Sequence, residues 1–270
     1  MCIRDSDSTA RIVEFTEKPK GDALKAMAVD TTILGLRPEE AEAKPYIASM
    51  GIYVFKKSAL VKFLESDYPE DNDFGGEIIP NASADGAKVQ AYLFNDYWED
   101  IGTMKSFFEA NLNLAKDPPN FEFYNADAPI YTSPRFLPPA KLERCHIKDS
   151  IISHGADLAD CTVHESIVGL RSRVSRGCTI NRTMIIGADH YESEEKRAAV
   201  LAAGGVPVGI GENCVIKNAI IDKNARVGKN CVITNAAGVE DLADEERGVF
   251  IRNGIVTILR NSTIPDGTVI

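Results

Sequence analysis

The sequence predicts an α/β layer followed by a β-solenoid. Two observations support this fold class: segments typical of strands and helices alternate through the first 116 residues, and from about Cys145 aliphatic residues recur every six positions. A composition of 44 % hydrophobic and 26 % charged residues is ordinary for a globular chain, and 270 residues suggest about two domains. We therefore expect a mixed first half and a repetitive second half.

Composition also excludes some classes of partner. The formal net charge of −10 argues against nucleic acid or an anionic membrane surface as the main partner, because both attract basic faces. No apolar run reaches the roughly 18 residues of a membrane span, and the N-terminus does not resemble a signal peptide. We expect a soluble protein.

The cysteines give no sign of a metal site. They form no Cys-x-x-Cys pair and lack the histidine spacing typical of zinc, so we expect neither disulfides nor a metal cluster. Most lie inside apolar runs, where they read as small buried hydrophobic residues in a reducing compartment. The six are Cys2, Cys145, Cys161, Cys178, Cys214 and Cys231.

The N-terminal region offers the first candidate ligand residues. Residues 1–10 carry no clear pattern, and we expect them to be disordered or non-native. A predicted strand over residues 11–15 leads into Glu17, Lys18 and Pro19. Proline ends the strand and keeps Lys18 extended, so Glu17 and Lys18 project from a strand end. Lysine suits a phosphate and a carboxylate suits sugar hydroxyls, although a solvated turn explains the same residues.

A second predicted strand, residues 47–55, contains one small hydroxyl, that of Ser49. Predicted helices flank it near residues 22–29 and 58–64, which completes an alternating α/β pattern. A serine in an otherwise apolar strand can donate a hydrogen bond to a ligand, or it can simply satisfy a packing limit.

Residues 96–102 hold the only tryptophan of the chain. A predicted strand over residues 89–94 precedes them, and a helix with Thr103 as N-cap follows. Carboxylates that end a strand before a helix lie at the carboxyl edge of the sheet, where α/β proteins usually bind ligands. Asp100 is thus a candidate for chemistry, but an aspartate in this position is also typical of a turn or a cap.

Phosphate-binding loops are missing from the sequence. Neither G-x-x-x-x-G-K-[ST] nor G-x-G-x-x-G occurs, and the glycine-rich residues 204–211 include a proline and no lysine in register, as in a connector. If the α/β half binds a nucleotide, we expect its phosphate-binding loop to precede residue 1. Residues 117–141 are rich in proline and aromatic residues and are predicted to form a packed linker.

The second half predicts a parallel β-helix of hexapeptide repeats. Inward aliphatic residues at every sixth position, with glycine or asparagine at corners that need a positive φ, specify this fold. A helix-like insert at residues 188–206 is expected to project from the stack. The aliphatic series are Val168, Val174, Ile180 and Ile186, and then Val215, Ile221, Val227 and Ile233.

Hexapeptide β-helices leave several functions open. The solenoid could be an acyltransferase with a histidine base, a regulatory and oligomerising module attached to a nucleotidyl-transfer domain, or part of a noncatalytic regulatory subunit. A carboxylate and a lysine that converge from the α/β half would favour nucleotidyl transfer. The available histidines, none of them in a distinctive motif, are His146, His154, His164 and His190.

Several segments carry a family pattern in order along the chain. They are EKPKG at 17–21, VDTTILGL at 29–36, IASMGIY at 47–53, YWEDIGT at 97–103, APIYT at 128–132, VGLRS at 168–172 and IIDKNAR at 220–226. Together they resemble ADP-glucose pyrophosphorylase (glucose-1-phosphate adenylyltransferase), in particular the form found in cyanobacteria, algae and plants. The similarity runs from about residue 11 to residue 270.

This resemblance implies a domain organisation. Residues 11–116 would be the C-terminal portion of a nucleotidyltransferase α/β domain, 117–141 the packed linker, and 142–270 a left-handed β-helix for regulation and oligomerisation, with the insert at 188–206. Family members carry a glycine-rich ATP loop and a second metal-binding aspartate ahead of the first matching segment. We therefore expect the chain to be part of a longer enzyme and to lack pyrophosphorylase activity alone.

The resemblance also implies a reaction and its residues. Glucose 1-phosphate attacks the α-phosphorus of ATP with the help of Mg²⁺, which gives ADP-glucose and pyrophosphate for glycogen or starch synthesis. Glu17 and Ser49 would contact the sugar, Lys18 would bind its phosphate and serve catalysis, and Asp100 would hold the catalytic Mg²⁺. Such a transfer depends on positioning and charge neutralisation more than on covalent catalysis.

Regulation is implied in the same way. Family members are homo- or heterotetramers of the cyanobacterial cytoplasm or the plastid stroma, activated by 3-phosphoglycerate and inhibited by orthophosphate. Lys223, Arg226 and Arg260 match effector-binding positions, although solvated basic residues would look the same. Asn253 stands where the family has serine, and Arg260 where it has lysine, so a bidentate fork replaces a point charge. Whether the subunit is catalytic or mainly regulatory stays open.

Overall fold

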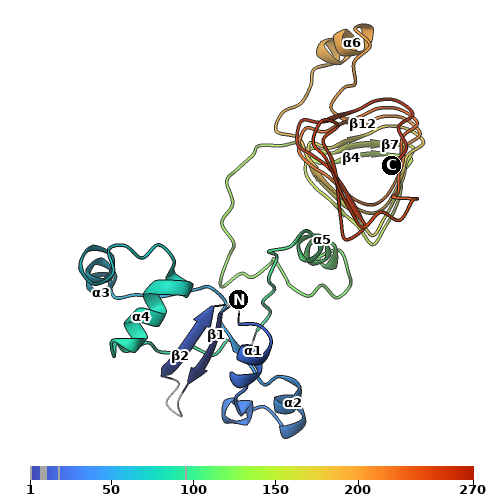
Figure 1. Cartoon of the computed structure of the whole chain (residues 1–270). Coiled ribbons are helices and arrows are strands. Elements are labelled where there is room, and N and C mark those ends of the chain that lie inside the picture. The colour runs from blue at the N-terminus through green and yellow to red at the C-terminus, as the bar shows by residue number, and fades with distance from the viewer. Residues whose placement is uncertain (1, 7–10, 18, 95) are drawn as a thin grey trace. The chain divides into compact units, whose positions relative to one another are not determined.

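The computed structural model describes residues 2–6, 11–17, 19–94 and 96–270. The chain forms two compact units, Met1–Trp98 and Glu99–Ile270, each described by itself below (Figure 1). Among the described residues no helix is long and apolar enough to cross a membrane.

The first unit contains a three-stranded antiparallel sheet. Strand β1 (Cys2–Ser6) lies between β2 (Ile12–Glu17) and β3 (Ile47–Ala48) and pairs with both. Residues 2–6 were expected to be disordered or non-native. They are ordered as β1, which pairs with both other strands, while the expectation that they are non-native stays a prediction. Residues 7–10, which the same expectation covered, lie outside the described residues.

Two of the predicted strands are shorter than expected. The strand predicted over residues 47–55 ends at Ala48, and Gly51, with φ of +73°, bends the chain after it. The strand predicted over residues 89–94 contributes a single bridge, from Gln90 to Arg11. In both segments the sequence is apolar, but no described strand continues alongside to complete a ladder.

Short helices surround this sheet. Ile79 of α4 packs on Ile12 and Phe15 of β2, and together they form the core of the first unit. The helical segments are α1 (Asp22–Ala26), η1 (Thr31–Leu34), α2 (Pro38–Ala43), α3 (Lys57–Lys62), η2 (Phe63–Asp67), η3 (Phe74–Ile78) and α4 (Ile79–Ala84).

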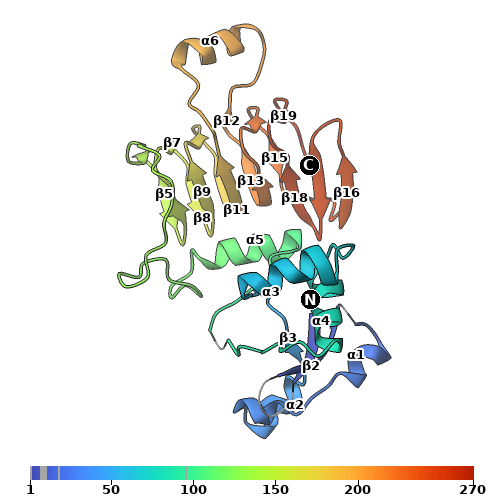
Figure 2. The same ribbon diagram turned by 90° about the vertical axis from the view of Figure 1, so that its left-hand side faces the viewer.

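The second unit is built on a parallel β-helix, seen along its axis in Figure 1 and from the side in Figure 2. Its strands are β4 (Lys141–Glu143), β5 (His146–Lys148), β6 (Ile151–Ile152), β7 (Asp157–Ala159), β8 (Thr162–His164), β9 (Ile167–Leu170), β10 (Arg173–Val174), β11 (Thr179–Gly187), β12 (Gly209–Ile210), β13 (Val215–Ile221), β14 (Arg226–Val227), β15 (Val232–Ile233), β16 (Asp241–Asp244), β17 (Val249–Arg252), β18 (Ile255–Ile258) and β19 (Thr263–Ile264).

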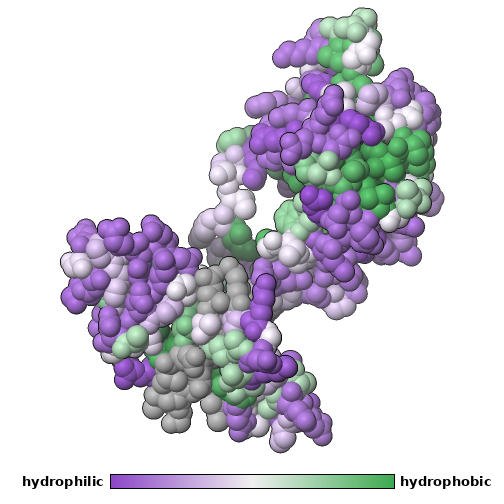
Figure 3. All heavy atoms as spheres, viewed as in Figure 1, coloured by the Kyte–Doolittle hydropathy of each residue, from purple (hydrophilic) through white to green (hydrophobic). Residues whose placement is uncertain are grey.

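Aliphatic side chains of successive coils stack in register. One such row consists of Leu142, Leu158, Val174, Ile210, Val227 and Ile264, which pair in parallel from coil to coil. From Leu158 onward the row is buried, so each coil covers the core of its neighbour. The end of the stack that carries the C-terminus presents a hydrophobic surface, green in Figure 3.

The predicted repeat positions are largely confirmed. Val168, Val174 and Ile180 are buried, as are Ile221, Val227 and Ile233. Val215 and Ile186 are exceptions. Val215 is 41 % exposed, and the neighbouring Ile216 faces inward instead. Ile186 is only partly buried and packs against the cluster around Phe108, while the neighbouring Ile185 lies in the core. The predicted asparagine corners are also confirmed, since Asn218, Asn224 and Asn230 have positive φ angles of 52°, 59° and 56°.

The predicted insert interrupts the stack between β11 and β12. It contains α6 (Glu194–Ala202), which begins at Ser193 as N-cap and projects from the β-helix (Figure 2). The periodicity did not predict the antiparallel hairpin β16–β17, which pairs with the edge of β18 near the end of the chain.

Helix α5 (Met104–Asn113) packs on the outside of the β-helix. Phe108 is fully buried and Leu112 nearly so, against Met184, Ile220 and Ile255. The predicted N-cap is confirmed, because Thr103 Oγ1 accepts a hydrogen bond from the Ser106 amide at 3.1 Å. Because α5 packs on the β-helix, the boundary between the two units falls after Trp98. The sequence analysis had placed the end of the α/β domain at residue 116.

The linker predicted over residues 117–141 has no helix or strand before β4. Its aromatic residues are exposed, with Tyr124 81 %, Tyr131 90 % and Phe136 95 % accessible. The C-terminal end of the linker does contact the β-helix, since the Pro138 carbonyl accepts a hydrogen bond from the Gly155 amide at 2.9 Å. The packing of the linker as a whole stays a prediction.

Candidate functional site

The sugar-phosphate residues predicted in the first unit are attached to two strand ends. Glu17 is the last residue of β2, and Ser49 directly follows β3. Both strands run antiparallel to β1, so they run parallel to each other, and Ile3 of β1 pairs with Thr16 on one side and Ala48 on the other. Glu17 and Ser49 are thus placed at the same edge of the sheet, one strand apart. Lys18 lies outside the described residues.

Ser49 has a clear local role in the structure. Its side chain is buried, and its Oγ accepts a hydrogen bond from the Gly51 amide at 3.2 Å and lies 3.4 Å from the Tyr53 hydroxyl. These contacts fix the bend that follows β3. Whether the hydroxyl also meets a ligand stays a prediction.

Asp100 belongs to the second unit, in the turn that precedes α5. It is exposed, and its Oδ1 accepts a hydrogen bond from the Gly102 amide at 2.8 Å. The turn role suggested by the sequence is therefore confirmed, and the same bond orients the carboxylate. The convergence of Lys18 and Asp100 in one cleft stays a prediction.

A cluster of charged residues lies at one corner of the β-helix and includes two of the three predicted effector residues. Lys223 Nζ donates to Asp189 Oδ1 at 3.1 Å, and Arg260 Nη2 donates to Asp189 Oδ2 at 2.6 Å. Asn224 Nδ2 donates to the same Oδ2 at 2.9 Å. We call Asp189, Lys223, Asn224 and Arg260 the corner cluster.

Three strands position the corner cluster. Asp189 follows β11, Lys223 follows β13 and Arg260 follows β18, and these strands are hydrogen-bonded neighbours in one parallel sheet. Because the coils stack in register, residues 34 and 71 positions from Asp189 in the sequence reach its carboxylate. The β-helix thus brings cations from two coils to one point.

The electrostatics of the corner cluster keep Asp189 ionised. The hydrogen bond from Asn224, followed by that from Lys223 and the charges of Lys223 and Arg260, lowers the pKa of Asp189 to about 2. At neutral pH the cluster therefore holds one negative and two positive charges.

Arg226, the third predicted effector residue, serves a different local purpose. Its guanidinium donates to Glu192 Oε1 at 2.6 Å and to the Val206 carbonyl at 2.8 Å, and Glu192 Oε2 accepts from the Val208 amide at 2.9 Å. These bonds tie both ends of the insert to the β-helix. Arg226 is only partly exposed, so much of its donor capacity is used within the fold.

A groove of about 660 Å³ lies beside the corner cluster, between the insert and the stack. Its lining includes Lys196, Asn224, Arg226 and Asn261, with His190 and Tyr191. Two asparagines of this lining are hydrogen-bonded to each other, Asn224 Nδ2 to Asn261 Oδ1 at 3.1 Å. The groove wall combines the charged side chains of Lys196, Glu192 and Arg226 with the apolar side chains of Ala199, Val200 and Val208.

Two protein families match the chain. The GLGC left-handed parallel β-helix domain matches residues 135–269, half of the 270-residue chain, and the nucleotidyl transferase family matches residues 2–117. The chain belongs to the GLGC β-helix family. The predicted fold class, a nucleotidyltransferase region followed by a left-handed parallel β-helix, is confirmed.

Local contacts are observed for two of the histidines considered as an acyltransferase base. His164 Nδ1 lies 3.0 Å from Asn181 Nδ2, and His164 Nε2 lies 3.4 Å from Asp149 Oδ2. His190 is the histidine that lines the groove described above. The match to a nucleotidyl transferase family supports the second function considered from the sequence, a nucleotidyl-transfer domain with an attached β-helix.

Two ion-pair partners of the predicted effector residues escaped the sequence analysis. Asp189 and Glu192 anchor the predicted effector cations, yet both lie in the insert, where the six-residue period stops. Asp189 lies two residues after the end of β11 and Glu192 five residues after it, and the sequence pattern at these positions gives no sign of their partners.

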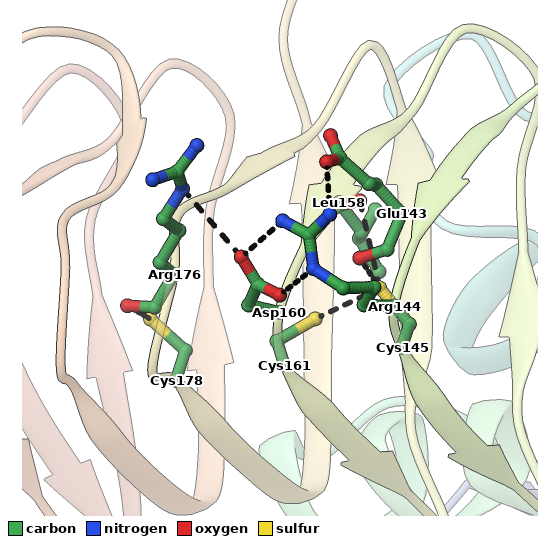
Figure 4. A network of polar contacts seen from close by, with 8 residues as sticks. All are labelled: Glu143, Arg144, Cys145, Leu158, Asp160, Cys161, Arg176 and Cys178. Atoms are coloured by element: carbon green, nitrogen blue, oxygen red, sulfur yellow. Dashed lines mark hydrogen bonds and ion pairs between the residues drawn. The ribbon is translucent and has the colours of Figure 1, made fainter.

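The sequence analysis also missed that the cysteines stack. Figure 4 shows Cys145, Cys161 and Cys178 on successive coils, beside the ion pairs of Asp160 with Arg144 and Arg176. The sulfur atoms of Cys145 and Cys161 lie 3.6 Å apart, and Cys178 Sγ donates to the Gly211 carbonyl at 3.0 Å. Burial raises the pKa of the Cys161 thiol to about 12. The Cys161 thiol is therefore a core side chain rather than a nucleophile.

Proposed function

We propose that this chain takes part in adenylyl transfer from ATP to α-D-glucose 1-phosphate, which yields ADP-glucose and pyrophosphate for glycogen or starch synthesis. One observation carries the proposal: a nucleotidyl transferase region and a GLGC β-helix occur in one chain, in that order. The seven segments that resemble ADP-glucose pyrophosphorylase lie in both regions.

In this proposal the edge formed by β2 and β3 binds the sugar phosphate. Glu17 accepts hydrogen bonds from glucose hydroxyls, Ser49 makes a second sugar contact, and Lys18 neutralises the phosphate and assists catalysis. The parallel direction of β2 and β3 supports this assignment, because it places Glu17 and Ser49 at one edge of the sheet.

Asp100 is proposed to hold Mg²⁺. The residue fits this ion, because Mg²⁺ is commonly bound by one or two carboxylates together with substrate phosphates, and Asp100 is exposed with its carboxylate oriented by the Gly102 amide. When bound, Mg²⁺ supplies neutralisation of phosphate charge during the transfer. Asp100 itself contributes position and negative charge for the ion.

The corner cluster is proposed to bind the regulatory anions 3-phosphoglycerate and orthophosphate, in a homo- or heterotetramer. Lys223 and Arg260 support this role, since both reach one carboxylate and so can both reach one external oxyanion. Arg226 is proposed to contribute through the insert, which it fastens beside the groove.

The test of the sugar-phosphate site is a binding measurement. Glucose 1-phosphate is titrated into the 270-residue chain by calorimetry, with glucose 6-phosphate as the matched control ligand. We expect preference for glucose 1-phosphate and roughly tenfold weaker binding by Lys18→Ala, because a charge-assisted hydrogen bond is lost. Lys20→Ala serves as the control variant. Equal binding of the two sugar phosphates would refute the proposed site.

The nucleotide is tested in the natural protein that contains these residues. Release of pyrophosphate from ATP, UTP or dTTP is measured with glucose 1-phosphate as the acceptor and Mg²⁺ present. Faster release with ATP is expected, and Asp100→Asn is expected to reduce it by roughly a hundredfold or more through loss of the metal-binding charge. Faster release with UTP or dTTP would assign the chain to a different sugar-nucleotide reaction.

A further inference from the structure

The two cations proposed to bind regulatory anions already have an anionic partner inside the protein. One carboxylate, that of Asp189, bridges them: Oδ1 accepts from Lys223 and Oδ2 accepts from Arg260. A phosphate or carboxylate ligand that used both cations would need the position that this carboxylate occupies. It therefore matters whether bonds other than those to the two cations fix the position of the Asp189 carboxylate.

Several hydrogen bonds hold Asp189 in place. Its backbone amide donates to Asn224 Oδ1 at 2.8 Å, while Asn224 Nδ2 donates to its carboxylate at 2.9 Å. Asn224 is itself fixed, because its backbone amide donates to the Gly187 carbonyl at 3.0 Å and its φ of 59° is that of a corner residue. The carboxylate is thus directed at the cations by the fold.

The cations remain within reach of solvent. The side chains of Lys223 and Arg260 are 44 % and 57 % exposed, and that of Asp189 is 27 % exposed. Ion pairs with this exposure are weak, so an external anion of higher charge can compete with the internal carboxylate. Asn224 of the cluster and its hydrogen-bonding partner Asn261 line the groove, which offers space for such an anion.

We propose that Asp189 is an internal counter-anion that competes with phosphate-bearing ligands for Lys223 and Arg260 and thereby sets their affinity. The inference rests on the proposed role of the corner cluster in binding regulatory anions. A ligand must displace the Asp189 carboxylate to use both cations, and the free energy of the internal pairs is subtracted from its binding free energy. Asp189 is therefore a residue that determines affinity without contacting the ligand through an attractive bond.

The decisive variant is Asp189→Asn, which removes the competing charge with little change in size. Affinities for orthophosphate and for 3-phosphoglycerate are measured by calorimetry on the 270-residue chain. We expect Asp189→Asn to bind both about three- to tenfold more tightly than the unmodified chain, the effect of removing two exposed ion pairs.

Glu212→Gln is the matched control, because it changes the net charge equally and also removes an exposed pair, Glu212 with Lys229 at 3.0 Å. No gain in affinity is expected for it. An equal gain in Glu212→Gln would mean that net charge alone governs binding, and the inference would be overturned.

A second measurement covers the case in which Asp189→Asn folds poorly. In the unmodified chain the carboxyl carbon of Asp189 and the side-chain amide of Asn224 are followed by NMR during titration with orthophosphate. Both resonances are expected to shift together and to saturate with the calorimetric affinity, because the ligand displaces the carboxylate from its amide donor. Saturated binding without a shift at Asp189 would overturn the inference.

The failure of the inference differs from that of the proposed function. If Lys223→Ala and Arg260→Ala abolish anion binding but Asp189→Asn leaves it unchanged, the regulatory site stands and Asp189 is not a competitor. If the unmodified chain and Asp189→Asn both fail to bind either anion, the proposed regulatory site and the inference fall together.

Discussion

In the β-helix unit a buried aliphatic side chain has similar neighbours one coil before and one coil after it, whereas in the α/β unit Ile12 and Phe15 meet side chains from a helix and from irregular segments. In the β-helix the same surroundings of a buried side chain recur from coil to coil. In the α/β unit the surroundings of each buried side chain occur only once. A residue in the stack therefore depends on adjacent coils, while a residue of β2 depends on segments far away in the sequence.

This difference extends to the candidate sites. The corner cluster draws on three neighbouring strands of one sheet, and each of its members has a hydrogen-bonding partner within the cluster. The sugar-phosphate edge depends on β3, a strand of two residues, and on the bend fixed by Ser49. We expect the corner cluster to be the more rigid of the two sites, and the predictions below test the stack on which it is built.

The largest effect is expected where α5 meets the stack. Phe108→Ala should lower the free energy of unfolding of the second unit by about 3–5 kcal/mol, because a fully buried aromatic side chain is lost between α5 and the outer face of the β-helix. Chemical denaturation followed by the helical signal measures this change. Lys105→Ala, an exposed position on the same helix, is the control. A loss below about 1 kcal/mol would show that α5 is not docked as described.

A similar but smaller loss is expected within the stack. Ile216 is fully buried and pairs with Ile180 and Ile233 on adjacent coils, so Ile216→Ala should cost about 2–4 kcal/mol. Val215→Ala changes the neighbouring, 41 % exposed side chain and should cost well under 1 kcal/mol by this reasoning. Denaturation midpoints of the two variants compare the two faces of β13. Equal losses would contradict the inward placement of Ile216.

The Ile216 position also shows what sequence periodicity can and cannot predict. The six-residue step identified the β-helix and most of its buried positions, because each coil repeats one environment. It assigned Val215 rather than Ile216 to the core, because it assumed that the six-residue step continues without a break. In β13 the inward-facing Ile216 and Ile221 are five positions apart instead of six. The corner asparagines were found because asparagine tolerates a positive φ.

Elements without a repeat were harder to predict. The strand expected over residues 47–55 has suitable side chains, but its length depends on a hydrogen-bonding partner, and β1 pairs with only two of its residues. Lys223 and Arg260 were identified from family resemblance, yet their shared partner Asp189 was not, because it comes from a third coil 34 and 71 residues away. Local pattern carries no information about such a meeting.

A corner variant separates backbone strain from hydrogen bonding. Asn224→Ala should destabilise the second unit by about 1–2 kcal/mol, because alanine is strained at the φ of 59° and loses the bonds to Asp189. Asn224→Gly removes the same bonds without strain and should be less destabilising. Thermal unfolding of both variants gives the comparison. If glycine costs more than alanine, the positive φ does not govern this corner.

The smallest effect concerns the pH dependence of stability. The pKa of Asp189 is about 2 in the folded protein, below its ordinary value of 3.8, so the ionised form is favoured by folding. The contribution of the ionised Asp189 to stability is complete at pH values above its pKa in the unfolded chain. It is lost as the pH falls through its pKa in the folded protein. Between about pH 4 and pH 2 the unmodified chain should therefore lose more stability than Asp189→Asn, which lacks this titration.

Denaturation of both proteins at several pH values in this range measures the difference, with Glu212→Gln as the control for a change of net charge. Because the Asp189 pairs are exposed, the difference should shrink when the salt concentration is raised, since screening weakens the attraction of Lys223 and Arg260 for the carboxylate. The hydrogen bond from Asn224 is not screened in this way. If the difference in stability between the two proteins does not depend on salt, Asn224 rather than the two cations stabilises the Asp189 carboxylate. The corner cluster would then be held by neutral hydrogen bonds, as the Ser49 bend of the α/β unit is.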